Sequence, residues 1–282
     1  MPTVTTSEIQ DTARRIRGHV LEMSHHAGSA HLGSALSCVD ILAAAYCSIL
    51  SIDPKNPDDP ARDRLILSKG HAVSALYGTL VERGFFAPEI LKTYNDDGGH
   101  LPEQPSPRCQ PGVELATGSL GHGLPVGLGF ALAARYNALP YRVIVVMSDG
   151  ECNEGTVWEA AMTAPAFGLT SVTVVIDYNH WQATARSDET LALAPLLEKW
   201  TAFGWHALEV DGHNIDQLRA AMEIRGETLG KPVVIIAHTI KGKGVSFMQD
   251  DNNWHYRSPN QKELVAAFAE LGLPEPVTEV TT

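Results

Sequence analysis

Two side chains with oxygen atoms suited to a metal ion each follow an apolar run of the chain. Asp149 comes shortly after residues 142–147, and Asn179, thirty positions later, comes shortly after residues 171–176. If both runs are parallel strands joined by a helix, their carboxyl ends are neighbours, and open α/β sheets bind ligands there. Carboxylate and amide oxygens suit Mg²⁺, which completes its octahedron with phosphate oxygens and water. The spacing predicts a divalent metal site, for Mg²⁺ first, with Ca²⁺ or Mn²⁺ as alternatives.

An anion can be held at the same point. Gly150 allows the backbone to approach a ligand, and the helix that follows directs its N-terminal amides toward negative charge. An Asp-Gly turn and a separate loop Asn are also common without any ligand. The spacing and the position after two strands favour the ligand site.

Several of the twelve histidines lie in loops, most of them beside glycine. They are His31, His71, His100, His122 and His255. Glycine lets the backbone come close to a ligand, and histidine gives and takes protons near neutral pH. Single loop histidines are often plain surface residues, but this recurrence favours a polar binding site. Their wide separation and the lack of cysteine partners argue against a zinc site.

The segments that must position these residues alternate between helices and strands. Apolar residues at three- and four-residue steps predict helices at 7–23, 36–50, 72–83, 124–139, 157–167 and 215–225. Apolar, β-branched runs predict strands at 65–67, 142–147, 171–176, 205–210 and 233–237. Such runs between helices are typical of an α/β fold with an open, mainly parallel sheet and helices on both faces. We expect a single domain over residues 1–282, with 274–282 as a frayed tail.

Composition excludes several classes of function. The net charge is −12, from 21 basic and 33 acidic residues, which argues against nucleic acid or an anionic membrane as a partner. Four cysteines without Cys-x-x-Cys spacing fit a reducing compartment. The N-terminus has no apolar signal segment, and the longest apolar runs are too short to cross a bilayer. We expect a cytoplasmic protein.

Residues 148–182 resemble the thiamine-diphosphate fold motif, in which Gly-Asp-Gly is followed by Asn at this spacing. Within it, residues 154–155 and 158–160 are similar to the transketolase version. The resemblance implies that the side chains of Asp149 and Asn179 and the carbonyl of Trp181 bind the metal that holds the diphosphate. It places Gly150 and Glu151 at the diphosphate end of the site.

The loop histidines also resemble transketolase segments, and these occur in the same order. Gly-Ser-x-His-x-Gly lies at 28–33, Ser-x-Gly-His at 68–71, Gly-Gly-His at 98–100 and Thr-Gly-Ser-Leu-Gly at 117–121. The resemblance implies that four histidines line the channel to the thiazolium C2 and bond sugar hydroxyls and cofactor phosphates. These are His31, His71, His100 and His255, of which His71 and His255 also belong to the cofactor site.

Other positions acquire roles from the same resemblance. Gly118 and Leu120 would contact the aminopyrimidine and thiazolium rings, and residues 239–244 would close over the cofactor; those residues could equally be a flexible turn. Glu154, together with Glu159, falls where the family has acidic residues between the two active sites of a dimer, which implies a buried, proton-sharing role. Two helix-borne carboxylates could equally be a solvated face. His122 stands where many members of the family have Gln, so the resemblance gives less support to a site role for His122.

The sequence departs from the family pattern at two places. Ser148 replaces the first glycine of the motif, which is tolerated if its φ is negative. Residues 183–187, Ala-Thr-Ala-Arg-Ser, stand where the family has an apolar residue and Asp-Gly. Both departures bear on diphosphate contacts and on substrate specialisation.

The resemblance covers only the N-terminal portion of a transketolase. It implies that a separate C-terminal subunit carries the pyrimidine domain and its activating glutamate, in an α2β2 assembly acting on sugars or sugar phosphates. The expected activity is transfer of a two-carbon ketol unit from a ketose to an aldose. The alternatives are another thiamine-diphosphate lyase or synthase, either deoxyxylulose-phosphate synthase-like or a specialised transketolase-like enzyme, and a non-catalytic cofactor-binding subunit.

Overall fold

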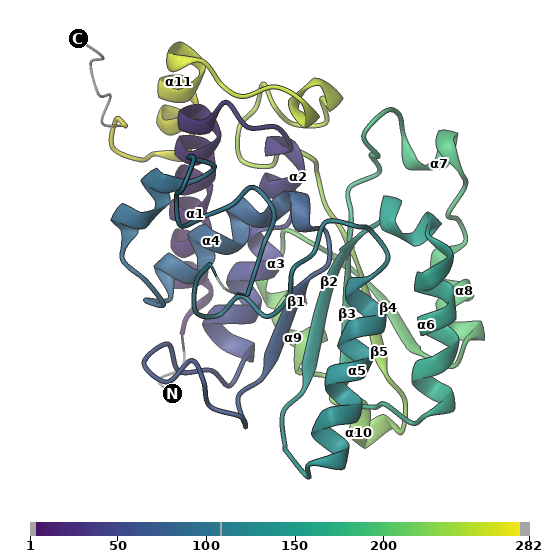
Figure 1. The fold of residues 1–282 in the computed structure, drawn as a ribbon. Helices are drawn as coiled ribbons and strands as arrows, with labels where there is room; N and C mark the ends of the chain where they lie inside the picture. The colour runs from purple at the N-terminus through teal and green to yellow at the C-terminus, as the bar shows by residue number, and fades with distance from the viewer. Residues whose placement is uncertain (1–3, 108, 277–282) are drawn as a thin grey trace.

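A five-stranded, fully parallel sheet lies at the centre of the computed structural model, which describes residues 4–107 and 109–276 (Figure 1). The strand order is β1-β2-β3-β5-β4. The strands are β1 (Arg64–Leu67), β2 (Val143–Ser148), β3 (Val172–Tyr178), β4 (His206–Asp211) and β5 (Val233–His238). All five predicted strands are present, and the predicted parallel α/β architecture is confirmed.

The continuous apolar strands supply two cores, one on each face of the sheet. In β2, Ile144 and Val146 belong to one hydrophobic cluster, whereas Val143, Val145 and Met147 belong to the other. Side chains alternate across a strand, so a strand covered on both faces must be apolar at nearly every position.

Helices cover both faces of the sheet (Figure 1). The residues packed on the first face come from α1 (Thr6–Ala27), α2 (Leu32–Ser37), α3 (Val39–Ala44), the π-helical turn η1 (Ala45–Ile49), α4 (Val73–Glu82), α9 (Ile215–Glu223) and α11 (Gln261–Leu271). The second face carries α5 (Gly123–Tyr136), α6 (Gly155–Ala166) and α8 (Leu196–Ala202). Shorter pieces are α7 (Ser187–Thr190), α10 (Gly226–Leu229) and the 3₁₀ turns η2 (Gly70–Ala72), η3 (Pro88–Thr93), η4 (Gly150–Asn153) and η5 (Asn252–His255).

The predicted helix 36–50 is wrong in its extent. The helical chain begins at Leu32, breaks at Cys38 (φ −92°, ψ 3°) and ends in the π-helical turn η1. Next to the break, Ser37 donates a hydrogen bond to buried Asp177, 2.5 Å away, an interaction that no local pattern records. The sequence pattern also misses α8 and α11, although α11 has a complete capping box between Asn260 and Glu263.

One end of the sheet concentrates the residues of interest. Ser148 at the end of β2 pairs in register with Asp177 in β3, and the Asp149 amide donates to the Asp177 carbonyl at 3.3 Å. The loops beyond these strand ends contain Asn179, and the turn at His71 follows the end of β1. Ser148 lies in the strand and is not among the residues with positive φ, so its replacement of glycine is accommodated.

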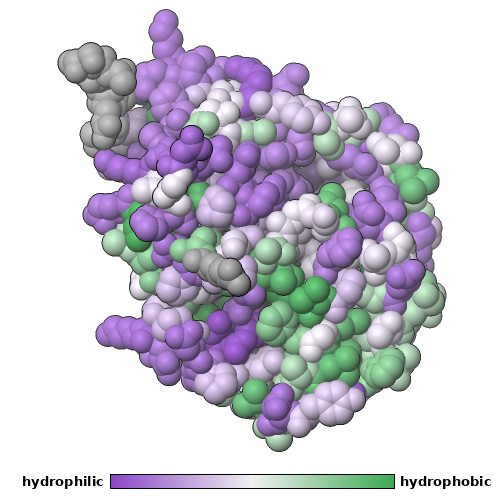
Figure 2. Space-filling model, viewed as in Figure 1, coloured by the Kyte–Doolittle hydropathy of each residue, from purple (hydrophilic) through white to green (hydrophobic). Residues whose placement is uncertain are grey.

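Large hydrophobic side chains are exposed on the helices of the second face. Val126 and Tyr136 of α5, Met162 of α6 and Phe167 just beyond α6 are each more than a third exposed in this single chain. Figure 2 shows hydrophobic side chains gathered low on the visible face, in the region of α5 in Figure 1. No helix in the described ranges is long and apolar enough to cross a membrane.

Candidate active site

Asp149 and Asn179 lie at adjacent strand ends, as the sequence predicts. Both are buried, with exposures of 0% and 3%. Asp149 accepts hydrogen bonds from the Gly150 amide (2.9 Å) and the Ser187 hydroxyl (2.8 Å). Burial raises the pKa of Asp149 to about 7, against the lowering effect of the Ser187 hydrogen bond. A desolvated carboxylate of this kind is stabilised in its charged form by a cation, so the side chain fits a metal ligand.

The oxygen atoms of the Asn179 loop are oriented by well-defined contacts. The Asn179 Nδ2 donates to Ser37 and Asp177, each at 3.3 Å, and its Oδ1 accepts from the Trp181 amide at 3.0 Å. Among the described residues, none donates a hydrogen bond to the Trp181 carbonyl. The three predicted donor groups therefore fit Mg²⁺, which takes few protein oxygens. No group of three His, Cys, Asp or Glu side chains suited to a metal occurs in the described ranges.

A buried ion pair, which the sequence analysis missed, lies beneath this loop. Lys69 and Asp177 are both 0% exposed, with Nζ 2.5 Å from Oδ2. Burial would raise the pKa of Asp177, but the Lys69 charge and hydrogen bonds from Lys69, Ser37 and Thr239 hold it below the ordinary value. Lys69 also donates to the Ser34 carbonyl at 2.8 Å. The pair ties the ends of β1 and β3 to α2. The Ser-x-Gly-His segment does not indicate that its lysine is buried, so the ion pair becomes apparent only in the folded structure.

Three of the predicted histidines form a cluster. The ring centroids of His31 and His255 are 5.0 Å apart, those of His31 and His71 5.2 Å, and those of His71 and His255 6.0 Å. They come from three separate segments, before α2, in η2 and in η5. The His31 amide donates to the His255 carbonyl at 2.6 Å, which holds two of these segments together.

The cluster is electrically neutral at pH 7. Burial, followed by the charge of Lys69, holds the pKa of His71 well below its ordinary value. Burial and the charge of Lys241 lower the pKa of His255 to about 3. Burial also lowers the pKa of His31, whose Nδ1 has no hydrogen-bond partner in the described residues; Glu103 Oε1 is 3.9 Å away. Neutral imidazoles with a free nitrogen can donate to or accept from a hydroxyl group.

Lys241 is a second residue that the sequence analysis did not single out. The residue is 1% exposed, and its Nζ contacts His255 Nδ1 (3.0 Å), Asn252 Oδ1 (2.7 Å) and the Gln182 carbonyl (3.3 Å). Burial lowers its pKa to about 8. The surrounding loop 239–244 is held by defined hydrogen bonds, including Gly242 N to the Gly33 carbonyl at 3.0 Å. These hydrogen bonds give the loop a defined path in the structure, which favours a positioning role over a plain turn.

His100 is exposed, and none of the ring contacts in the described ranges joins it to the three clustered histidines. Its amide bonds the Thr93 hydroxyl at 3.2 Å, and the next residue, Leu101, is buried and bridges to Tyr94. Glu103 of the same loop approaches His31. The structure thus brings this loop near the cluster without bringing the His100 ring into it.

Glu151 is buried, and its carboxylate is held by hydrogen bonds from three residues. Its carboxylate accepts from the Ser68 hydroxyl, the Gly121 amide (2.8 Å) and the Ser148 amide (3.3 Å). With both oxygens engaged, the buried side chain anchors loop 117–123, and a place at the diphosphate end of the site stays a prediction. The anchor positions Gly118 (φ 156°) and Leu120, which are exposed and half-buried.

Glu154 and Glu159 are both exposed in this single chain, as is His122. Glu154 is the N-cap residue of α6 and makes no side-chain capping bond. A buried, proton-sharing role would require a partner surface, and it stays a prediction.

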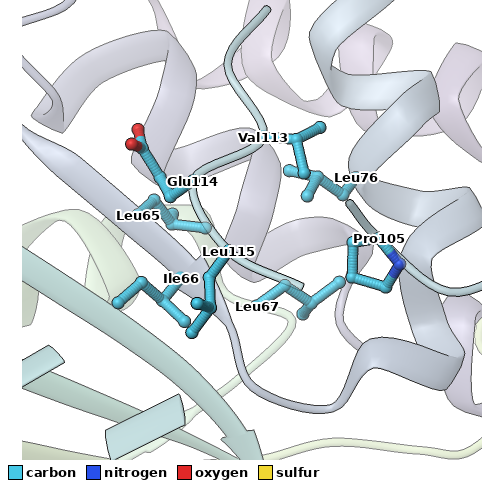
Figure 3. Close-up of a pocket in the computed structure, with 8 residues that line it drawn as sticks. All are labelled: Leu65, Ile66, Leu67, Leu76, Pro105, Val113, Glu114 and Leu115. Carbon is cyan, nitrogen blue, oxygen red and sulfur yellow. The ribbon is translucent and has the colours of Figure 1, made fainter. Parts of the chain in front are cut away.

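A small cavity lies apart from these residues, beside β1 (Figure 3). Its lining is apolar except for Glu114, whose carboxylate points away from the other labelled side chains in Figure 3 and pairs with Arg62 and Arg64. A ligand pocket needs convergent polar groups. The cavity is a packing gap beside Pro105 and residues 113–115, and it lacks the polar lining of a ligand site.

A family model and several similar proteins all point to transketolases. A family model described as "Transketolase, thiamine diphosphate binding domain" matches residues 9–280. The chain is similar to the 6-deoxy-6-sulfo-D-fructose transketolase subunit SqwG of Clostridium sp. (strain MSTE9), with 41% identity over 264 residues, 94% of this chain and 96% of that protein. It is 38% identical to an apulose-4-phosphate transketolase subunit from Phocaeicola vulgatus over 268 residues, 95% of this chain and 94% of that protein.

A full-length relative of known structure shows the same fold. The transketolase from Campylobacter jejuni superposes with a TM-score of 0.89 at 26% identity, over 96% of this chain and 43% of that one. The chain therefore spans less than half the length of that solved structure.

Proposed function

The chain belongs to the transketolase family, and from that premise we propose that it is the N-terminal, cofactor-binding subunit of a two-chain thiamine-diphosphate-dependent transferase. The enzyme would transfer a two-carbon ketol unit from a ketose to an aldose. In this proposal residues 1–282 form one diphosphate-binding domain, and the protein acts in the cytoplasm. Of the tail expected at 274–282, residues 277–282 lie outside the described ranges.

The proposed enzyme includes a partner subunit. Relatives of the same length are named as subunits, and full-length relatives are more than twice as long. The exposed apolar side chains of α5 and α6 provide a surface for assembly. We propose a C-terminal transketolase subunit with the pyrimidine domain as the partner, in an α2β2 assembly.

Thiamine diphosphate, when bound, supplies the carbon nucleophile that carries the two-carbon unit. This chain's contribution is to hold and orient. Asp149, Asn179 and the Trp181 carbonyl would hold Mg²⁺, or Ca²⁺ or Mn²⁺, against the diphosphate. Gly150 and the N-terminus of α6 would leave room and amide donors for the anion. The observation that carries the assignment is the pair Asp149 and Asn179, both buried at adjacent strand ends.

The histidine cluster would recognise the sugar. His31, His71 and His255 are neutral at pH 7, so each ring carries one N–H donor and one acceptor nitrogen and does not repel a cation nearby. His71 Nε2 lies 2.9 Å from the Ser34 hydroxyl, and His255 Nδ1 lies 3.0 Å from Lys241, so both rings are fixed in orientation. Such groups can position hydroxyls and move protons between them.

A sugar-specialised transketolase-like enzyme is the second candidate. Two relatives are named for particular sugars, 6-deoxy-6-sulfo-D-fructose and apulose 4-phosphate. The departure at 183–187 lies beside the metal residues, through the Ser187 bond to Asp149. These features favour specialisation over a general ketose donor.

The test combines this chain with a pyrimidine-domain subunit, thiamine diphosphate, Mg²⁺ and a panel of ketose donors and aldose acceptors. Transfer should need both chains, and deuterium exchange at the cofactor C2 should be rapid only in the mixture. Rapid exchange with this chain alone would overturn the two-chain assignment. Cofactor binding by the mixture without any turnover or exchange would support a non-catalytic subunit. Ketose consumption with a different product would support another lyase or synthase.

A further inference from the structure

Trp181, Arg186 and Asp250 form a closed set of contacts at the surface beside the metal residues. The Arg186 guanidinium lies 3.8 Å from the centroid of the Trp181 ring and makes two bonds to the Asp250 carboxylate, at 2.6 and 2.7 Å. The Trp181 indole N–H donates to the same carboxylate at 2.7 Å. Each residue thus contacts the other two, and we call this set the latch.

The latch joins two loops that are distant in the sequence. Trp181 and Arg186 pair as a short antiparallel bridge, with Gln182 N bonded to the Ala185 carbonyl at 2.9 Å. Asp250 follows the loop that contains Lys241, and its amide donates to the Lys241 carbonyl at 2.8 Å. The latch therefore joins the segment that contains Trp181 to the segment that contains Lys241.

Two residues at the ends of the latch have a left-handed backbone conformation. His180, which precedes Trp181, has φ 66°, and Asp250 has φ 58°. Residues other than glycine seldom adopt this left-handed region, and they persist there where surrounding contacts over-determine them. The contacts of the latch therefore lie at two points where the backbone turns through a left-handed conformation.

We propose that the latch is a positioning device for the metal, which keeps the Trp181 carbonyl directed at the ion and couples it to the Lys241 loop. This inference rests on the proposed function, because it takes the Trp181 carbonyl as a metal ligand. An ordinary exposed ion pair contributes little. A bidentate guanidinium that also stacks on an indole has one geometry, so it fixes the position of the ring and of the backbone attached to it.

Arg186 lies in residues 183–187, where the sequence departs from the family pattern. Residues of this segment make three contacts around the site. The Ser187 hydroxyl donates to Asp149, Arg186 stacks on Trp181, and Asn252 donates to the Ala183 carbonyl at 3.0 Å. The segment therefore contacts two of the three residues proposed to bind the metal. Ser187 contacts the Asp149 carboxylate directly, and Arg186 contacts the indole of Trp181, whose carbonyl is the proposed ligand.

The experiment measures cofactor binding as a function of Mg²⁺ concentration in the enzyme assembled with its pyrimidine-domain partner. In Arg186→Met and Asp250→Asn, the Mg²⁺ concentration that gives half-maximal cofactor binding should rise about 10–100-fold, the usual effect of losing an outer-shell partner. Saturating Mg²⁺ should restore cofactor affinity, which general structural damage would not allow. Asn also tolerates a positive φ, so Asp250→Asn removes the charge with little change in backbone preference.

A matched control is available. Arg257 stacks on Trp254 at 4.4 Å and pairs with Glu263 at 2.6 Å, the same combination of groups placed outside the proposed metal donors. Arg257→Met should leave the Mg²⁺ dependence unchanged. In metal-free protein, hydrogen exchange of the Gln182 and Ser187 amides should be faster in Arg186→Met than in the wild type, since the latch no longer holds their loop.

The outcomes separate the two proposals. If the wild-type assembly binds cofactor without any dependence on Mg²⁺, the metal site itself is overturned. If it depends on Mg²⁺ and the Arg186→Met titration matches the wild type, the latch is overturned and the metal site stands. An equal shift in Arg257→Met would also overturn the latch, because the effect would then not be specific to it.

Discussion

Lys241 Nζ lies 3.0 Å from Nδ1 of His255, and this contact decides the tautomer of the histidine. An ammonium group has only donors, so Nδ1 must accept and the proton of the neutral ring resides on Nε2. Burial, with the Lys241 charge, holds the pKa of His255 at about 3, so the ring keeps this form at neutral pH. His255 therefore offers an N–H donor whose orientation is set by a residue fourteen positions earlier.

Removal of the Asp149 carboxylate should abolish metal-dependent cofactor binding. In Asp149→Ala we expect the cofactor affinity of the assembled enzyme to fall by at least about 10²-fold in the presence of Mg²⁺, since a side-chain ligand is lost outright. Calorimetry with and without Mg²⁺ measures this. Asp58→Asn, a change of an exposed carboxylate in a surface loop, is the control. Equal affinity in Asp149→Ala and wild type would sink the assignment.

The Lys69–Asp177 pair should show strong energetic coupling. Asp177→Asn leaves a buried ammonium without its counter-ion, and Lys69→Met leaves a buried carboxylate alone, so each should cost about 3–5 kcal/mol of stability. The double variant should cost much less than the sum of the two. Urea unfolding of the four proteins provides the cycle. Simple additivity would show that the two charges do not interact.

The surface pair Arg15–Glu82, with its 2.8 Å contact, is the comparison for that cycle. Arg15 is 47% exposed on its side chain, so Arg15→Met should cost no more than about 1 kcal/mol. A cost for Arg15→Met equal to that of Lys69→Met would mean that burial is not the cause.

Acid should destabilise the chain through its buried histidines. The folded-state pKa of His255 is lowered from 6.5 to about 3, so between these values the unfolded chain binds more protons than the folded one. The contribution is complete above pH 6.5 and is lost as the pH falls toward 3. His31 and His71, also lowered, act in the same direction.

The measurement is the urea midpoint at neutral pH and at about pH 5, within the range where histidine titrates. His255→Gln should lose less stability on acidification than the wild type, because one titrating group is gone. His122→Gln, a change of an exposed histidine, should follow the wild-type curve. Parallel curves for all three proteins would contradict the neutral-cluster interpretation.

Replacing a clustered and an exposed histidine should have different effects on cofactor binding. His255→Ala should cost about 10²–10⁴ in turnover, the range for positioned acid–base groups, and should also weaken cofactor binding. For His100→Ala the sequence predicts an equal cost in turnover with a far smaller effect on cofactor affinity. Steady-state kinetics on both variants decides this. Full activity of His100→Ala would remove His100 from the channel.

The sequence by itself determined the architecture and most of the site. Apolar β-branched runs between amphipathic helices predict a parallel sheet covered on both faces. A strand that is apolar at nearly every position is stable only where both of its faces are buried. The end of such a strand is where ligands bind, so the positions of Asp149 and Asn179 could be anticipated without coordinates. The Gly-flanked segments around His31 and His71 identified two of the three clustered histidines, and the segment before His255 identified the third.

Only the tertiary structure decided which charges are buried and what each contacts. Lys69 meets Asp177 across 108 positions, and Lys241 meets His255 within a loop whose path depends on α2. A local pattern cannot record such pairs, because burial of a charge depends on elements brought together from distant segments. For the same reason only the structure shows that Glu151 anchors loop 117–123 and that Arg186 of the departing segment holds Trp181 against Asp250.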